Sequence, residues 1–114
     1  MHIDSYEFGV IVIDGKAYGS DCLIYAGKVH ANWWRQQGHL LSAEDLQAVI
    51  AARPSVVVIG CGASGLMKVP AETENALQKA GIEFETCDTS RAVRRFNELA
   101  GADSNVAAAF HLTC

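Results

Sequence analysis

The segment from Ser55 to Ile59 reads Ser-Val-Val-Val-Ile and contains four consecutive β-branched residues. Side chains on a strand point alternately to the two faces of its sheet, so an unbroken apolar run is typical of a strand buried on both faces. Helices are the usual cover for such a strand. The run therefore predicts the central strand of an α/β domain, with helices packed against its sheet.

Downstream of residue 41, helical and strand-like patterns alternate along the chain. Ser42 and Asp45 form a capping box, Pro70 suits the first turn of a helix, and Gly81 suits a helix end. We expect helices over 42–53, 70–81 and 89–101, and strands over 55–59, 82–87 and 106–112. Because such alternation implies crossover connections, we expect a largely parallel sheet.

The first part of the chain reads as β structure. Strand-like runs cover 8–13 and 22–25, and 29–34 makes a third extended segment. Asp14-Gly15 is a strong hairpin signal. Since no repeat, linker or low-complexity tract divides the 114 residues, we expect 1–114 to form a single domain, to which the β-rich start adds a hairpin or an edge layer.

Composition excludes several classes of function. The net charge of −4 argues against general nucleic-acid binding, and the one basic cluster (Arg91, Arg94 and Arg95) falls on the solvated face of an amphipathic helix. No apolar run approaches the roughly 18 residues that span a bilayer, and the first residues lack the pattern of a signal peptide or presequence. We therefore expect a cytoplasmic protein that binds no nucleic acid and does not insert into a membrane.

The cysteine pattern argues against metal and redox chemistry. No two of the four cysteines (22, 61, 87 and 114) have the spacing of a metal knuckle or a C-x-x-C motif. His111 and Cys114 would point to opposite faces of a strand, so they make a poor zinc pair. The sequence predicts no bound metal and no cofactor.

The glycine-rich loop Gly60-Cys61-Gly62-Ala63-Ser64-Gly65 matches G-x-G-x-x-G directly after the buried strand. A dinucleotide fingerprint opens straight into a helix, whereas here four residues separate the loop from Pro70, which argues against NAD or FAD. The loop still lies at the carboxyl end of a central strand, where open α/β sheets bind ligands. Two interpretations stay open: a tight turn that needs glycine, or a ligand or partner site that includes Gly60, Cys61, Gly62, Ser64 and Gly65.

A nucleophilic Cys61 would need a neighbouring base, for which His39 and His111 are the candidates. The sequence places neither histidine beside Cys61, and a histidine within an apolar strand is more often a satisfied core group. We therefore predict no catalytic residue.

Asn32-Trp33-Trp34-Arg35 concentrates two indoles and a cation. In an extended segment the two indoles face opposite sides, so one belongs to the core while the other is exposed. Tryptophan followed by arginine is the chemistry of interface hot spots, and core packing of both indoles is the alternative. We expect a partner surface with one tryptophan, for which we name Trp34, and with Arg35.

A series of short motifs resembles a widespread family of small domains. In chain order they are Ser5-Tyr6, Phe8-Gly9, Asn32-Trp33-Trp34-Arg35, Gly38-His39, Val58-Ile59-Gly60, Gly62, Ser64-Gly65, Val69-Pro70, Phe96-Asn97, Ala107-Ala108-Ala109 and His111-Leu112-Thr113-Cys114. That family includes uncharacterised bacterial and archaeal proteins, the adipogenesis-associated domain protein and the mitochondrial assembly factor 3 of respiratory complex I. The resemblance extends over essentially the whole chain.

This resemblance implies a three-layer α/β fold: a mixed, mostly parallel central sheet flanked by helices, with an additional N-terminal β layer. It implies no established enzymatic activity, and its mitochondrial members act through a protein partner. We therefore predict a non-catalytic binding or assembly module. The alternatives are a small-ligand-binding protein or enzyme that uses Gly60–Gly65 to hold an anionic group, and an apolar surface that serves a homodimer.

Overall fold

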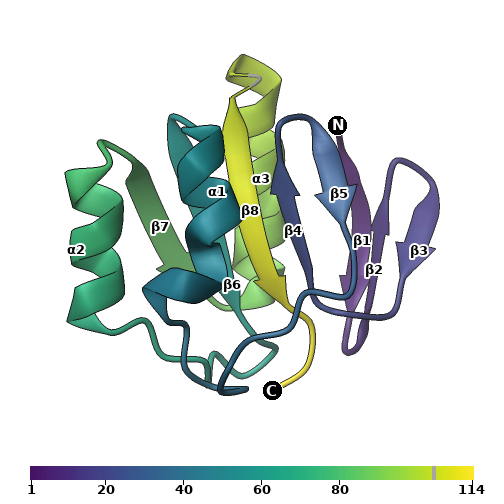
Figure 1. The fold of residues 1–114 in the computed structure, drawn as a ribbon. Coiled ribbons are helices and arrows are strands. Elements are labelled where there is room, and N and C mark those ends of the chain that lie inside the picture. The colour runs from purple at the N-terminus through teal and green to yellow at the C-terminus, as the bar shows by residue number, and fades with distance from the viewer. Residues whose placement is uncertain (104) are drawn as a thin grey trace.

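The computed structural model describes residues 1–103 and 105–114, which form two sheets and three α-helices (Figure 1). The strands are β1 (Ile3–Glu7), β2 (Val10–Ile13), β3 (Lys16–Tyr18), β4 (Cys22–Tyr25), β5 (Lys28–His30), β6 (Val56–Cys61), β7 (Glu83–Cys87) and β8 (Val106–His111). The helical segments are the 3₁₀ turn η1 (Ala43–Leu46) and the helices α1 (Gln47–Ala52), α2 (Ala71–Lys79) and α3 (Thr89–Ala102). The chain therefore has a mixed α/β fold.

The larger sheet has the strand order β5-β4-β8-β6-β7. β6 pairs in parallel with both β8 and β7 and is buried along its whole length, which confirms the central strand predicted over 55–59. The pairs β4–β8 and β4–β5 are antiparallel. The sheet is therefore mixed, as predicted: both pairs that β6 makes are parallel, and both pairs that β4 makes are antiparallel.

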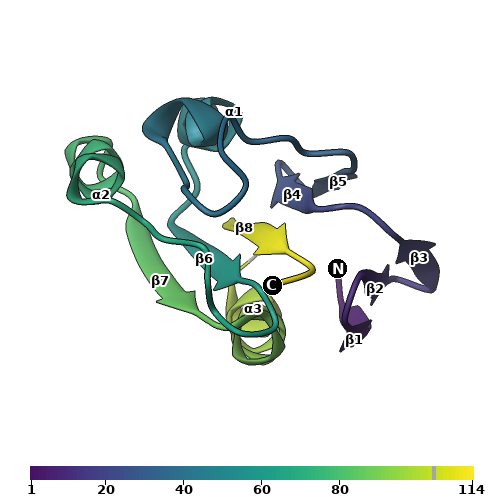
Figure 2. The same cartoon turned by 90° about the horizontal axis from the view of Figure 1, so that it is seen from below.

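Helices cover both faces of this sheet, with α1 and α2 on one face and α3 on the other (Figure 2). The interior strand β8 carries Ala107, Ala108 and Ala109, which have no exposed surface. Ala107 and Ala109 pack into the same cluster as Leu77 of α2, while Ala108 packs into the cluster of Phe96 on α3. Since alanine has a short side chain, β8 lets the covering layers on its two faces approach closely.

The smaller sheet, β1-β2-β3, packs on the same side as α3. Its inward residues Ile3, Ile11 and Ile13 are buried in the cluster that contains Phe96. The side-chain amide of Asn97 accepts a hydrogen bond from the Ile3 N–H and donates one to the Ile3 carbonyl, both over 2.8 Å. This reciprocal pair fixes β1 against α3, so the β-rich start of the chain forms part of the core.

Two predicted strands differ from the observed ones because the backbone turns within them. Gly9 has a φ of +80°, so the expected strand over 8–13 begins only at Val10, and residues 3–7 form an additional strand. Asn32 has a φ of +56°, and the extended segment expected over 29–34 ends as a strand at His30. The predicted hairpin at Asp14-Gly15 is confirmed, as are the three predicted helices, the first of which starts as η1. No helix in the described part of the chain is long and apolar enough to cross a membrane.

Candidate functional site

The parallel strands β6, β7 and β8 end at the same side of the molecule, the lower side in Figure 1. Residues 19–21, 31–42, 62–69 and 112–114 meet there, and we call these four segments the rim. Backbone hydrogen bonds join them: Trp33 N–H donates to the Asp21 carbonyl over 3.0 Å, Leu41 N–H to the Lys68 carbonyl over 2.9 Å, and Leu66 N–H to the Cys114 carbonyl over 3.1 Å. The rim is therefore one connected surface built from distant parts of the sequence.

The glycines at the end of β6 are required by close packing. A Cβ atom on Gly60 would lie 2.9 Å from Thr89 Oγ1 and 3.0 Å from Phe110 Cδ1. Gly62 has a φ of +103°, and a Cβ atom there would lie 2.2 Å from the carbonyl carbon of Cys114. Side chains cannot occupy these positions without moving the backbone or the core. Gly60 therefore leaves room for the side chains of Thr89 and Phe110, and Gly62 leaves room for the backbone of Thr113 and Cys114.

The same loop uses its amides within the protein. Gly62 N–H donates to Thr89 Oγ1 over 2.9 Å, Ala63 N–H to the Thr113 carbonyl over 2.7 Å, and Gly65 N–H to the Gly62 carbonyl over 3.1 Å. Cys61 and Gly65 line a shallow pocket of about 290 Å³ at the ends of β6 and β7, and Ser64 is exposed. Because these amides already have acceptors, an anion would have to replace bonds that the chain makes to itself.

Cys61 pairs in register with His111 across β6 and β8, so the structure does bring a histidine to the neighbouring strand. Within the described residues, however, His111 Nε2 has no hydrogen-bond partner, and its Nδ1 contacts Asp21 and Arg35 instead. Burial raises the pKa of the Cys61 thiol above its ordinary value. The thiol is thus kept protonated, which is the opposite of what nucleophilic catalysis requires.

The two neighbouring tryptophans have opposite environments. The Trp33 residue is 9 % exposed, and its Nε1–H donates to the Asp45 carbonyl over 3.1 Å. Trp34 is 83 % exposed. The expected division into one core indole and one surface indole is therefore observed, although it arises from a loop that turns at Asn32 and not from strand alternation.

Arg35 points inward, in contrast to the surface position expected from the sequence. Its side chain is only 5 % exposed, and its guanidinium lies over the Trp33 ring, 4.7 Å from the ring centroid. Arg35 Nη2 lies 2.9 Å from Asp21 Oδ2 and also donates to the Gly38 carbonyl over 2.9 Å. The cation therefore belongs to a buried ion pair and does not form part of the exposed surface around Trp34.

Asp21 connects this ion pair to the sheet. Its Oδ1 accepts the Leu112 N–H over 2.8 Å, and its Oδ2 lies 2.8 Å from His111 Nδ1. Burial acts to raise the pKa of Asp21, but the hydrogen bonds from Leu112, His111 and Arg35 outweigh burial and lower it below the ordinary value. Asp21 is therefore a carboxylate at neutral pH and holds both Arg35 and His111.

The hydrogen-bond partners of His111 determine which of its two ring nitrogens carries the hydrogen. Asp21 Oδ2 is a carboxylate oxygen that can only accept a hydrogen bond, and it lies 2.8 Å from His111 Nδ1. Nδ1 must then carry the ring hydrogen and donate it to Asp21. In the neutral ring, Nε2 is consequently a hydrogen-bond acceptor. It is buried and unpartnered within the described residues.

The three side chains line a pocket of about 340 Å³ in the rim. Its other lining residues are Gly19, Ser20, Trp33, Trp34, Gly38 and Thr113. Sequence reasoning named Trp34 and Arg35 but missed Asp21 and took His111 for a satisfied core residue. Since Asp21 and His111 are 90 positions apart, no local pattern in the sequence could have joined them.

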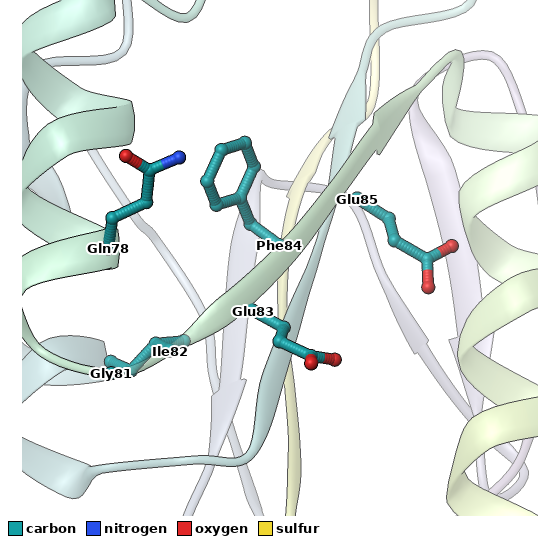
Figure 3. A pocket seen from close by; sticks show the side chains of 6 residues that line it. All are labelled: Gln78, Gly81, Ile82, Glu83, Phe84 and Glu85. Atoms are coloured by element: carbon teal, nitrogen blue, oxygen red, sulfur yellow. The ribbon is translucent and has the colours of Figure 1, made fainter.

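A larger pocket of about 520 Å³ lies beside the edge strand β7 (Figure 3). Gln78 and Phe84 lie on one side of β7, whereas Glu83 and Glu85 point away to the other (Figure 3). Glu85 is paired with Arg95, whose Nε donates over 2.7 Å. The polar groups here do not converge on one point, so the rim pocket is the better candidate site.

The comparisons with known proteins agree on the fold. The chain is similar in structure to a conserved hypothetical protein of Pyrococcus horikoshii, with 26 % identity, a TM-score of 0.85 and 100 % of each chain covered. It is also similar to a protein of Bartonella henselae described as an outer membrane protein, with 25 % identity, a TM-score of 0.84 and coverage of 98 % of this chain and 94 % of that one. A Mth938-like domain of Bordetella pertussis matches with 20 % identity and a TM-score of 0.79, over 97 % and 85 % of the two chains.

One family model matches residues 3–111, which is nearly the whole chain. That span includes the rim residues Asp21, Arg35 and His111 as well as the glycine-rich loop. The chain belongs to the family described as protein of unknown function DUF498/DUF598.

Proposed function

We propose that this protein is a non-catalytic binding or assembly module, and that a protein partner contacts the rim at Trp34. The observation that carries the proposal is the 83 % exposure of the Trp34 indole within an otherwise anchored loop. The neighbouring Trp33 is buried, and Arg35 is fixed by Asp21 and Gly38. An aromatic side chain presented on a rigid support loses little conformational freedom on binding, which is typical of an interface hot spot.

Two further exposed apolar side chains lie near the rim. Phe8 is exposed in the turn between β1 and β2, where the next residue, Gly9, donates its N–H to the Leu112 carbonyl over 2.9 Å. Leu66 is exposed and donates its own N–H to the Cys114 carbonyl. Trp34 lines the same pocket as Thr113, so each of the three exposed residues lies close along the chain or in space to the segment 112–114. Grouped exposed apolar side chains mark surfaces that associate.

The assembly role rests on the resemblance to the mitochondrial assembly factor, and the cytoplasmic location rests on the sequence alone. A second copy of the chain is the other partner that an apolar rim would suit. The alternative site at Gly60–Gly65 stays a prediction, and the internal use of the Gly62, Ala63 and Gly65 amides does not support it.

Photo-crosslinking in cells tests the proposal directly. A photoreactive phenylalanine analogue replaces Trp34 in one variant and the exposed Lys79, at the end of α2, in a matched control. We expect a discrete crosslinked adduct from position 34 that the control does not give. An adduct of the chain with itself would identify the partner as a second copy. The absence of any adduct at position 34, or the same adducts from both positions, would contradict the proposal.

A further inference from the structure

The larger sheet ends at β7, and no other strand of the described chain pairs with the outer edge of β7. Its five residues, Glu83–Cys87, pair in continuous register with β6. Glu83 N–H donates to the Ser55 carbonyl over 3.2 Å, so the backbone groups of Glu83 point toward β6. Because these groups alternate in direction along a strand, the N–H and C=O of Phe84 and Thr86 point away from β6. β7 therefore presents two open peptide groups to a further strand.

The other edge strands are better protected against pairing with another chain. β3 and β5 are three residues long, and each begins with a lysine. β1 has five residues, but its register with β2 shifts between Ile3 and Ser5, and Asn97 binds both the N–H and the carbonyl of Ile3. Short length, lysine and irregular register are devices that keep edge strands from pairing with other chains. β7 has none of these three.

A pocket of about 520 Å³ follows this edge from Gly81 to Glu85 (Figure 3). The half-buried Phe84 ring lies on the same side of β7 as Gln78, whereas Glu83 and Glu85 lie on the other side (Figure 3). A strand placed beside β7 has the same alternation, so every second side chain would lie beside Phe84 and the others beside the glutamates. An extended segment needs such a row of contacts and not polar groups that converge on one point.

The charges along the edge restrict which segment fits. Glu85 is already paired with Arg95 through two hydrogen bonds, over 2.7 and 3.0 Å. Glu83 is exposed and has no ion-pair partner among the described residues. Two antiparallel copies of β7 in full overlap would place Glu85 opposite Glu85, and a shift of two residues would place Glu83 opposite Glu85. Since like charges directly opposite each other are destabilising, the edge favours a basic segment over a second copy of itself.

We propose that β7 accepts an extended segment of a partner protein as a sixth strand of the larger sheet. Basic side chains of that segment lie beside Glu83, and its apolar side chains lie against Phe84. Main-chain hydrogen bonds at Phe84 and Thr86 provide affinity, and the alternating side chains provide specificity. The pocket beside β7 shares no residue with the rim pocket, so this proposal does not depend on a partner at Trp34.

Amide hydrogen exchange followed by NMR tests the proposal on the wild-type chain. The probe is the acetylated and amidated heptapeptide Lys-Val-Lys-Val-Lys-Val-Lys. Without the peptide, the N–H groups of Phe84 and Thr86 should exchange faster than that of Glu83, which is bonded to β6. At saturation with the peptide, the exchange of Phe84 and Thr86 should slow by about tenfold or more. A peptide that does not bind, or that binds without this slowing, would overturn the proposal.

Thr86→Pro blocks the proposed pairing from the side of the protein. The substitution removes an outward N–H but no bond to β6, and proline is tolerated at such edge positions. Thr86→Ala is the matched control, and the unfolding midpoints of both variants show whether the fold is kept. The proline variant should lose peptide binding, whereas the alanine variant should bind as the wild type does. Equal affinities of the two variants would overturn the proposal.

Backbone methylation of the peptide makes the same test without changing the protein. One peptide carries N-methyl groups on its valines, and a second carries them on its lysines. In an added strand, one of these two sets of N–H groups must face β7. At least one methylated peptide should therefore lose binding to the wild-type chain. Retained binding of both methylated peptides would overturn the proposal.

Charge reversal tests the partner's chemistry. Glu83→Lys should weaken binding of the lysine peptide by about fivefold and strengthen binding of its counterpart with glutamate in place of lysine. Glu72→Lys, at an exposed position of α2 outside the pocket, makes the same change in net charge and should alter both affinities much less. Equal effects of the two variants would overturn the proposal. Slowed exchange at Phe84 and Thr86 that depends on protein concentration without peptide would also overturn it, because the occupant would then be a second copy.

Discussion

The glycine-rich loop Gly60–Gly65, which enters the rim at Gly62, and the rim loop Trp33–Gly38 differ in how they use their polar groups. In the first, Gly62 is crowded by Thr113 and Cys114, and the Gly62 and Ala63 amides donate to Thr89 and Thr113. The second turns Arg35 inward beside a pocket and leaves Arg35 Nη1 without a partner among the described residues. A glycine motif can thus record a close approach within one chain, whereas an ordinary-looking loop can hold a buried cation beside a pocket.

The sharpest test of the crowded loop is Gly62→Val. The substitution places a branched side chain at a φ of +103° and within 2.2 Å of the Cys114 backbone. We expect it to lower the free energy of unfolding by about 4 kcal/mol, at the upper end of single-residue effects. Urea denaturation followed by circular dichroism measures the loss. Gly65→Ala, where a Cβ has no neighbour within 4 Å, is the control and should cost about 1 kcal/mol. Equal losses in the two variants would show that packing against segment 112–114 is unimportant.

For the loop Trp33–Gly38, whose Arg35 pairs with Asp21, the test is Asp21→Ala. This substitution should lower the free energy of unfolding by nearly as much as Gly62→Val. It leaves the Arg35 guanidinium buried and without its counter-charge, and it removes the acceptor of the Leu112 N–H. Breaking a buried pair from one side costs about 3 kcal/mol or more. The double variant Asp21→Ala with Arg35→Met removes both charges and should recover part of this loss. A double variant no more stable than Asp21→Ala would mean that the ion pair is not the source of the effect.

Acid pH should selectively reduce the contribution of Asp21 to the free energy of unfolding. The pKa of Asp21 is lower in the folded protein than its ordinary value of 3.8, so its stabilising effect is present above that value and disappears as pH falls through the folded pKa. The stability difference between wild type and Asp21→Asn should therefore narrow as the pH falls below about 4. Denaturation midpoints of both proteins across this range measure it. If the stability difference between wild type and Asp21→Asn stays constant down to about pH 2, then the pKa of Asp21 is not lowered by its partners in the folded protein.

The smallest expected effect on stability belongs to Trp34→Ala, which should change the free energy of unfolding by no more than about 0.5 kcal/mol because the side chain is exposed. Trp33→Ala, its matched control, removes a core indole and should cost about 3 kcal/mol. Thermal and urea denaturation of both variants separate the two roles. If Trp34→Ala also destabilises the protein by several kcal/mol, then the indole is structural and the proposed partner surface fails.

Periodicity and local backbone signals predicted much of the fold. The β-branched run of β6, the hairpin at Asp14-Gly15 and the helix starts near Pro70 and Thr89 depend on neighbouring residues, and the structure confirms them. The partner of a strand depends on distant residues instead. The sequence therefore predicted a mixed sheet but did not show that β4 pairs with β8.

The candidate site was predicted only in part for the same reason. Trp34 and Arg35 stood out by composition, yet the direction of Arg35 depends on Asp21, which the turn of the chain at Asn32 brings close. Asp21 itself lies in an unremarkable Gly-Ser-Asp turn. The histidine was seen but taken as satisfied, because sequence does not reveal that only one of its two ring nitrogens finds a partner among the described residues.

The position of β8 has a consequence for how the protein is made. β8 lies between β4 and β6, although it follows every other strand in the chain. During synthesis, β4 and β6 therefore leave the ribosome before β8 has been made. Until then, the strand edges that pair with β8 have no partner. Such late, long-range pairing is slow compared with helix formation. We expect nascent chains of this protein to depend on chaperones, and the sheet to close only once residues 106–111 have left the exit tunnel.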